Sequence, residues 1–377
     1  MPLPVTIVPV STHEELTTFV TFPWEVYRDH PLWVPPIVKD DMALLSPGKH
    51  PFWETARRKL FMAMRGDRAV GRIAAIVDDK SNSYWQEKCG AFGFFECLPD
   101  DEAALALLRS AAQWLRDQGM DFMRGPLNPS TNYTCGLLVE GFDVPPGLMM
   151  PWNPPYYAKM LHRFCMRKEQ DLLAYHIYKD RVQVAPWIES ELARLKKKGD
   201  FTFRRSKKAT LARDVEIMLQ IYGESWAKNF AFSPLSETES RALVKELVSF
   251  LDPRFFVLFF HGDEPAGGMV ALPNFNPLLR RLNGRMGLSA LWHYLVSRRK
   301  IRESYRIMLF GIREKYRLLG LPLLLFDYML AQARAQADFR WVEGSWVLED
   351  NAAVDDLIED FGGEACKRYR IYRKDLL

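Results

Sequence analysis

The stretch MLFGIREKYRLLGLPLLLFDYMLAQARA, residues 308–335, decides how the rest of the chain is interpreted. It begins with an apolar run typical of a strand, passes through a basic turn that contains Gly320, and continues as a long apolar helical pattern. Backbone amides at the start of a helix suit a phosphate group, and Arg313, Lys315 and Arg317 add positive charge beside them. An ordinary strand–turn–helix connection has the same pattern, so the remaining sequence must decide between the two interpretations.

Composition narrows the class of protein. A chain of 377 residues with 48% hydrophobic residues predicts two folded domains, and its net charge of +4 favours anionic ligands without requiring nucleic acid. The five cysteines lack CxxC spacing, and no HExxH motif or paired-Asp cluster suggests a metal, so neither a disulfide framework nor a metal site is predicted. The N-terminal residues lack a signal-peptide pattern. The most apolar window, 318–330, is shorter than the roughly 20 residues of a membrane span. We therefore expect a cytoplasmic protein.

An internal repeat indicates a duplicated unit. RGDRAVGRIAAI (65–76) and HGDEPAGGMVAL (261–272) share a Gly-Asp turn after an apolar run, which predicts two β-hairpins. Asn153 and Asn351 each precede a helical pattern and then a strand, at nearly the same offset. We expect two units, residues 1–185 and 186–377, with 188–200 as a connector. Their mixed order of strands and helices predicts an α+β fold with a mixed α/β sheet.

With this order established, the opening stretch resembles the cofactor site of the GNAT superfamily of N-acyltransferases. The family motif, Gln/Arg-x-x-Gly-x-Gly/Ala, is matched by residues 317–322, except that Pro322 lacks the last amide donor. Further stretches, including DHPLWVPPIVKDD (29–41) and the segment from 124 to 157, resemble a bacterial group of tandem GNAT-like proteins. The resemblance implies two tandem GNAT-like acyl-CoA N-acyltransferase domains and acetyl-CoA or another acyl-CoA as cofactor. The cofactor-binding residues that we expect are Gly311, Ile312, Arg313, Lys315, Arg317, Leu318, Gly320, Leu321 and Asn351.

The first unit differs at the equivalent turn. Its helical pattern begins with Asp100, Asp101 and Glu102 instead of a glycine turn, and these carboxylates would repel a pyrophosphate. We therefore expect the N-terminal copy to be degenerate and the cofactor site to lie in the C-terminal unit.

Acyl transfer to an amine needs a group that accepts a proton from the ammonium. Glu349, at the end of a predicted strand, is the first candidate for this base, and Glu224 is the second; both could also be ordinary solvated carboxylates. In many family members a Tyr acts as general acid, but the resemblance puts Ile358 at that position. Tyr316 and Tyr328 are close in sequence, and neither hydroxyl is placed at the thiolate by the sequence.

Three functions remain open. The first is transfer of an acyl group, as in N-acetyltransferases, to a small-molecule or peptide amine, with no nucleic acid involved. The second is a non-catalytic protein that binds acyl-CoA or another anion. The third is an aminoacyl-tRNA-dependent transferase, which the basic run at 194–214 would permit but the glycine turn does not favour. The sequence leaves the acceptor, the acyl chain length and the oligomeric state open.

Overall fold

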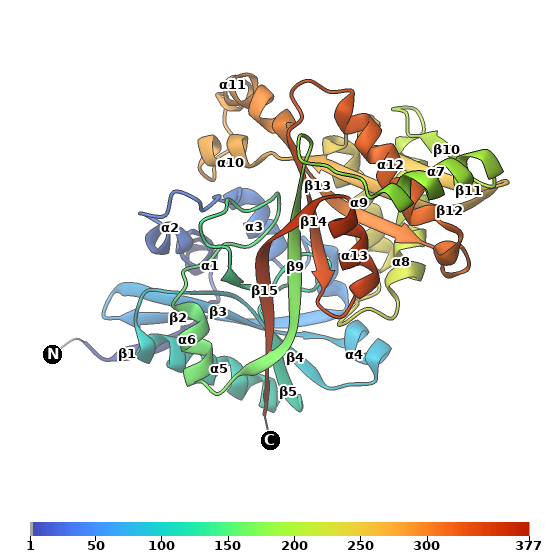
Figure 1. Cartoon of the computed structure of the whole chain (residues 1–377). Helices are drawn as coiled ribbons and strands as arrows, with labels where there is room; N and C mark the ends of the chain where they lie inside the picture. The colour runs from blue at the N-terminus through green and yellow to red at the C-terminus, as the bar shows by residue number, and fades with distance from the viewer. Residues whose placement is uncertain (1–2, 377) are drawn as a thin grey trace.

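A computed structural model describes residues 3–376 as two similar halves built on one continuous mixed sheet (Figure 1). We keep the predicted boundary at 185 as the label that separates the N-terminal half from the C-terminal half. The elements of the N-terminal half are β1 (Val5–Pro9), α1 (His13–Thr21), α2 (Pro23–Val26), α3 (Val38–Leu44), η1 (Pro51–Glu54), β2 (Ala56–Arg65), β3 (Arg68–Asp78), α4 (Asp79–Trp85), β4 (Cys89–Cys97), α5 (Asp101–Asp117), β5 (Phe122–Gly125), β6 (Leu127–Asn128), β7 (Thr134–Cys135), β8 (Leu137–Glu140), α6 (Tyr157–Arg163) and β9 (Arg167–Tyr178).

The C-terminal half begins with the additional helix α7 (Pro186–Lys198) and then repeats the main order of strands and helices, without strands that correspond to β6, β7 and β8. After α7 its elements are β10 (Thr202–Arg205), α8 (Leu211–Trp226), α9 (Glu237–Phe250), η2 (Pro253–Phe255), β11 (Phe256–His261), β12 (Glu264–Pro273), α10 (Asn276–Leu282), α11 (Ala290–Glu303), β13 (Ser304–Ile312), η3 (Glu314–Leu319), α12 (Leu321–Arg334), β14 (Trp341–Leu348), α13 (Ala352–Asp360) and β15 (Gly363–Asp375). The predicted α+β fold with a mixed sheet is confirmed.

The two halves exchange their last strands. Along the sheet the strands follow the order β1-β2-β3-β4-β5-β15-β9-β14-β13-β12-β11-β10, and β8 pairs with β15 outside this path. Thus β15 pairs with β5 of the N-terminal half, where Tyr372 faces Gly125, and β9 pairs with β14 of the C-terminal half, where Tyr178 faces Trp341. These two strands also pair with each other and cross the centre of the molecule (Figure 1). The boundary at 185 stays a prediction, and the sheet contains strands from both sides of it.

Both predicted hairpins are present. The turn between β2 and β3 lies at Gly66 and the turn between β11 and β12 lies at Gly262, with φ of 60° and 58°. A positive φ is unfavourable for residues with a Cβ, which explains why each Gly-Asp pair begins with glycine.

Alternating side chains of the C-terminal strands contribute to two separate hydrophobic core layers, one on each face of the sheet. Val257 and Met269 pack with α7, α12 and α13, whereas Leu258 and Val270 pack with α8 and α9, so these helices cover opposite faces of the sheet. The segment that we expected to be a connector, 188–200, is instead largely helix α7. It buries Ile188 and Leu195 against the sheet and α12, and its lysine run belongs to the exposed face of an amphipathic helix.

Across residues 3–376, no helix is both long enough and apolar enough to cross a membrane.

Candidate functional site

Strands β13 and β14 separate and leave a gap in the C-terminal half. They pair in parallel from Ser304 opposite Trp341 to Ile307 opposite Gly344, and beyond that point the two strands no longer pair. The unpaired walls are residues 308–312 of β13 and 345–348 of β14, and we call the space between them the C-terminal gap. Ser345, Trp346 and Phe310 are half-buried along these walls.

Backbone groups of β13 face the gap. Arg313 N donates to Ala266 O of β12, so the alternation of an antiparallel ladder directs the groups of Ile312 toward the gap and those of Gly311 toward β12. Helix α8 supplies partners for two of the carbonyls. Trp226 Nε1 donates to Phe310 O and Ser225 Oγ donates to Ile312 O, each at 2.9 Å. On its gap side, the end of β13 is therefore contacted by side chains of α8, while β12 pairs with its other side.

The glycine turn leads to a helix start without a side-chain cap. Gly320 has φ of 79°, and no side chain caps the first turn of α12. A Cβ at Gly320 would overlap Leu195 of α7, so glycine is required here for space as well as for conformation. The first amides of a helix have no partner within the helix, although Pro322 removes one of them. The predicted residues from Arg313 to Leu321 lie together at this turn.

The three cations of the turn differ in their partners. Glu264 accepts hydrogen bonds from Arg313 at 3.0 Å and from Lys315 at 2.7 Å, and the bond from Lys315, followed by that from Tyr316, lowers the pKa of Glu264 to about 2. Arg317 donates to the carbonyls of Ser225 at 2.9 Å and Ile312 at 3.3 Å. Within residues 3–376, Arg317 has no carboxylate at ion-pair distance, so it is the cation best able to meet an anionic ligand.

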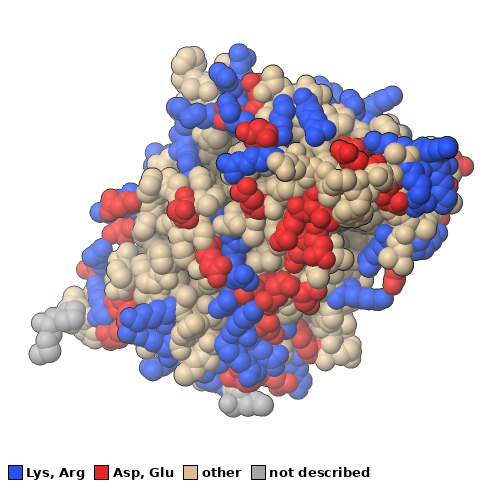
Figure 2. Space-filling view, in the orientation of Figure 1, with Lys and Arg blue, Asp and Glu red and all other residues tan. Residues whose placement is uncertain are grey.

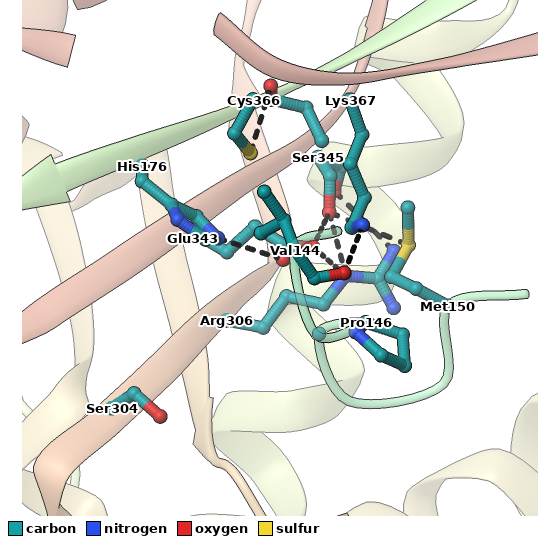
Figure 3. A network of polar contacts seen from close by, with 12 residues as sticks. Val144, Pro146, Met150, His176, Ser304, Arg306, Glu343, Ser345, Cys366 and Lys367 are labelled. Atoms are coloured by element: carbon teal, nitrogen blue, oxygen red, sulfur yellow. Dashed lines mark hydrogen bonds and ion pairs between the residues drawn. The ribbon is translucent and has the colours of Figure 1, made fainter. Parts of the chain in front are cut away.

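A buried polar network lies where the strands separate (Figure 3). Glu343 is fully buried, and its carboxylate accepts from Ser345 Oγ at 2.7 Å, lies 3.4 Å from His176 Nε2 and lies 4.0 Å from Arg306 Nε. Burial alone would raise the pKa of Glu343, but the contacts with His176 and Arg306 outweigh it and lower the pKa. The closed end of the gap therefore holds a carboxylate that stays charged.

A loop of the N-terminal half, residues 141–150, covers this network. Leu148 O accepts from Arg306 at 2.8 Å, and the buried Lys367 donates to the carbonyls of Gly141, at 2.6 Å, and Val144. A Cβ at Gly147 would overlap the carboxylate of Glu343, so only glycine fits against it. One half of the molecule thus closes the inner end of the gap in the other half.

We did not predict this network from the sequence. A signal was present, because Arg306 and Glu343 are charged residues inside apolar strand patterns, and a charge in a buried strand requires partners. The partners could not be identified, because His176 and the 141–150 loop belong to the other half of the chain.

The candidate bases are both engaged in ion pairs. Glu349 contacts Lys168 at 2.5 Å and accepts from Asp171 N at 2.9 Å, so it links the end of β14 to β9. Glu224 lies next to Ser225 on α8, is about half exposed, and contacts Arg313 at 3.0 Å. Of the two, Glu224 lies beside the residues that contact the end of β13.

The remaining predicted residues fall on both sides of the gap. Asn351 precedes α13 without capping it, directly after β14. Ile358 is buried, Tyr316 donates its hydroxyl to Glu264, and the hydroxyl of Tyr328 accepts from Arg205. Among residues 3–376, no group of three His, Cys, Asp or Glu side chains is arranged to hold a metal ion.

The corresponding space in the N-terminal half is filled by the chain itself. Strands β4 and β5 pair from Cys89 to Ala91 and then separate, but β6 returns against β4. Asn128 Oδ1 accepts from Phe94 N at 2.5 Å, and a Cβ at Gly93 would overlap Leu127 O. Asp100 caps α5 by accepting from Ala103 N at 3.1 Å and contacts Arg65 at 2.6 Å.

An apolar cavity of about 40 Å³ lies between α12 and the sheet. Its lining includes Ile307 and Val342, which stand just before the strands separate, and Met329 of α12. The cavity therefore borders the closed end of the C-terminal gap on the α12 face.

The fold, with its gap between separating parallel strands, is the GNAT fold. A tandem GNAT protein from the clavulanic acid biosynthesis pathway aligns over 99% of both chains with a TM-score of 0.57 and 12% identity. A GCN5-related N-acetyltransferase from Sphaerobacter thermophilus covers 99% of this chain and 97% of its own, with a TM-score of 0.53 and 12% identity. At these identities the likeness shows the fold alone.

Sequence relatives show the family. The bacterial ceramide synthase of Caulobacter vibrioides is 32% identical over 376 residues, which cover 98% of this chain and 97% of that protein. Protein YghO of Escherichia coli is 30% identical over 372 residues, which cover 96% and 93% of the two chains. The chain belongs to the family of these two proteins. No protein-family model matches the sequence.

Proposed function

We propose that the chain is an acyl-CoA-dependent N-acyltransferase with one cofactor site, in its C-terminal half. The observation that carries the proposal is the open C-terminal gap, which runs from the backbone of Phe310 and Ile312 to the uncapped start of α12. A strand edge can hydrogen-bond the amides of a pantetheine arm, and helix amides can bind a pyrophosphate. Acetyl-CoA or another acyl-CoA contains both groups, which supports it as the cofactor.

The residues present fit such a cofactor. Arg317 and the amides at Leu318, Gly320 and Leu321 would hold the pyrophosphate, with Arg313 and Lys315 at the rim where Glu264 partly neutralises them. Ile312 of β13, with Gly311 next to it, would line one side of the pantetheine arm. Asn351, directly after β14, would line the opposite side. The bound cofactor supplies the activated acyl group, and the protein holds it and the amine in position.

The base is proposed to be Glu224 or Glu349. Each would accept the proton that the acceptor ammonium must lose before its nitrogen can react. Glu224→Gln and Glu349→Gln separate the two. The base variant should lower kcat with little change in KM and should alter the pH profile. If Glu349 has only a structural role, Glu349→Gln should instead lower the melting temperature, because it weakens the bonds to Lys168 and Asp171 N.

The proposed acceptor is a long-chain amino alcohol. A ceramide is the amide of a fatty acid with such a base, and the relative with that name matches nearly the whole chain. The apolar cavity beside Ile307 and Val342 supports an apolar tail at the closed end of the gap. Its present volume admits only a few methylene groups, so a longer tail requires flexible side chains such as Met329 to move.

Calorimetric titration with acetyl-CoA and hexadecanoyl-CoA tests cofactor binding, and mass spectrometry of reactions with sphinganine, small amines and a peptide tests transfer. We expect binding of the acyl-CoA and N-acylation of sphinganine in preference to the other amines. Absence of binding to both thioesters would overturn the proposal. Acylation of the peptide or small amines alone would keep the enzyme class and reject the lipid acceptor.

One observation favours a second candidate, a non-catalytic acyl-CoA-binding protein. The sequence resemblance puts Ile358, which is buried, at the position of the general acid of many family members, and the hydroxyls of Tyr316 and Tyr328 are already hydrogen-bonded to Glu264 and Arg205. Tight acyl-CoA binding without any acylated product across the amine panel would support this candidate.

A further inference from the structure

Helix α11 exposes its apolar side chains to solvent. Leu291, Trp292 and Leu295 follow helical spacing on one face, and their exposed fractions are 69%, 66% and 44%. Ser297 and Ile301 are the residues of α11 that are buried, on the side that packs against the protein. A surface helix normally buries its apolar stripe, so this orientation requires an explanation.

The preceding loop extends the apolar area. Met286 is 69% exposed and Leu288 is completely exposed. We call the set the α10–α11 surface, and its apolar members are Met286, Leu288, Leu291, Trp292, Leu295 and Val296.

Basic residues border the apolar side chains. Residues 280–303 contain one acidic residue, Glu303, and the seven cations Arg280, Arg281, Arg285, Arg298, Arg299, Lys300 and Arg302. Within the described residues, the only ion pair that these cations make is Arg299 with Asp338, at 3.8 Å. Lys and Arg side chains gather at the top of the molecule, where α10 and α11 project (Figures 1 and 2).

We propose that the α10–α11 surface docks on a lipid bilayer that contains anionic phospholipids. Exposed Leu and Trp side chains beside unpaired Arg and Lys are the combination that binds at the bilayer interface, where apolar side chains enter the acyl boundary and cations meet anionic headgroups. A second copy of the chain fits less well, because two such surfaces would bring like charges together. The helix lies on the bilayer without crossing it, in agreement with its 14 residues.

The position of the surface gives docking a consequence. Asn276 of α10 donates to Pro146 O at 2.8 Å and to Gly147 O at 3.0 Å, so this region holds the loop that closes the C-terminal gap. Helix α11 ends at Glu303 and leads directly into β13, the strand whose residues 308–312 form one wall of the gap. A docked molecule would therefore have its candidate site next to the membrane. Docking itself needs no acyl-CoA and is independent of the proposed reaction.

Vesicle flotation of the full-length chain tests the proposal, with phosphatidylcholine vesicles that either contain or lack phosphatidylglycerol. We expect binding to the anionic vesicles that weakens as salt is added. Arg298→Gln with Lys300→Gln should weaken binding about fivefold for each charge removed. Leu291→Ser with Trp292→Ser should weaken it by about tenfold or more, since both apolar contacts are lost.

The matched control is Trp187→Ser, which changes an exposed Trp on α7, outside the α10–α11 surface. It should leave vesicle binding unchanged, and circular dichroism should show that all variants fold. Failure to bind anionic vesicles, equal binding to both vesicle types, or equal loss in the Trp187→Ser control would overturn the proposal. So would light scattering that shows a dimer which Leu291→Ser with Trp292→Ser converts to monomers, because the surface would then be a self-interface.

Discussion

In the N-terminal half the chain itself fills the space between the separating strands β4 and β5. In the C-terminal half the equivalent space between β13 and β14 is left as the C-terminal gap. The segment after β5 folds back as β6 against β4, where Asn128 accepts from Phe94 N, whereas the gap-facing carbonyls of Phe310 and Ile312 in β13 accept from side chains of α8. The N-termini of the two equivalent helices differ in a similar way, since one is capped by a side chain and the other is not. Asp100 caps α5, while Gly320 leaves α12 uncapped. The two halves therefore share the fold, and the features that we propose to bind an anion lie in the C-terminal half.

The largest expected effect on stability comes from replacing Glu343, the buried carboxylate at the closed end of the C-terminal gap. Glu343→Gln should destabilise the fold by about 3 kcal/mol, because Arg306 is then left buried without its charge partner. The lowered pKa of Glu343 means that its contribution is complete above the usual carboxylate pKa and is lost as the pH falls through the lowered value. Urea unfolding across the acid range should show a weaker pH dependence in the variant than in the parent.

Glu96 of the N-terminal half is the matched control. It accepts from Tyr27 and Tyr157, and burial raises its pKa despite the opposing effects of Arg72 and the two hydroxyls. The sign is then reversed, so its charge costs stability as the pH rises through the raised value. Glu96→Gln should be less damaging at neutral pH than Glu343→Gln. Equal losses with the same pH dependence would contradict the different electrostatic roles of the two carboxylates.

A carboxylate placed at the glycine turn should make the C-terminal half resemble the N-terminal half. Leu318 is 98% exposed beside the start of α12, so Leu318→Glu adds charge without disturbing packing. Repulsion of a pyrophosphate should weaken acetyl-CoA binding about tenfold, which corresponds to about 1.4 kcal/mol. Calorimetry of Leu318→Gln supplies the uncharged control. Equal affinities of the two variants would place the cofactor elsewhere.

Removing the cap of α5 tests the other half. Asp100→Ala should lower the free energy of unfolding by about 1 kcal/mol, because Ala103 N loses its acceptor and Arg65 loses a partner. It should not create acyl-CoA binding, since Asn128 still occupies the edge of β4. A second equivalent of acyl-CoA bound by this variant would show that the cap alone had closed the site.

The smallest expected effect concerns α8, the helix whose Ser225 and Trp226 reach the end of β13. A Cβ at Gly223 would meet no atom within 4 Å, so Gly223→Ala should raise the free energy of unfolding by about 0.5–1 kcal/mol through helix propensity. Acyl-CoA affinity should not change. Weaker binding in a more stable variant would indicate that the helix must bend at Gly223 when the cofactor enters the gap.

Local patterns were sufficient for much of this architecture. Apolar runs followed by Gly-Asp turns predicted the two hairpins, and both are present. The superfamily fold and the glycine turn before α12 are confirmed, while the binding role of that turn stays a prediction.

Long-range partners could not be predicted in the same way. Strand alternation specifies which face of a strand is buried but not which strand lies beside it, so the exchange of β9 and β15 left no local trace. The 141–150 loop contacts Arg306 and Lys367 through backbone carbonyls, which have no side-chain signature. Helix α7 was mistaken for a connector because its exposed lysines hid the spacing of Ile188, Leu192 and Leu195.

The exchange of strands also governs how the molecule can be made. Strand β5 is synthesised long before Tyr372, its neighbour across Gly125 in the finished sheet. During translation the N-terminal half therefore waits with an open edge on β5, at the point where β15 must later insert. Such edges invite pairing with other chains, and closing them over a long sequence separation is slow. We expect nascent chains that end before β15 to be protease-sensitive and to aggregate. The two halves should become resistant to proteases together, once β15 has been synthesised.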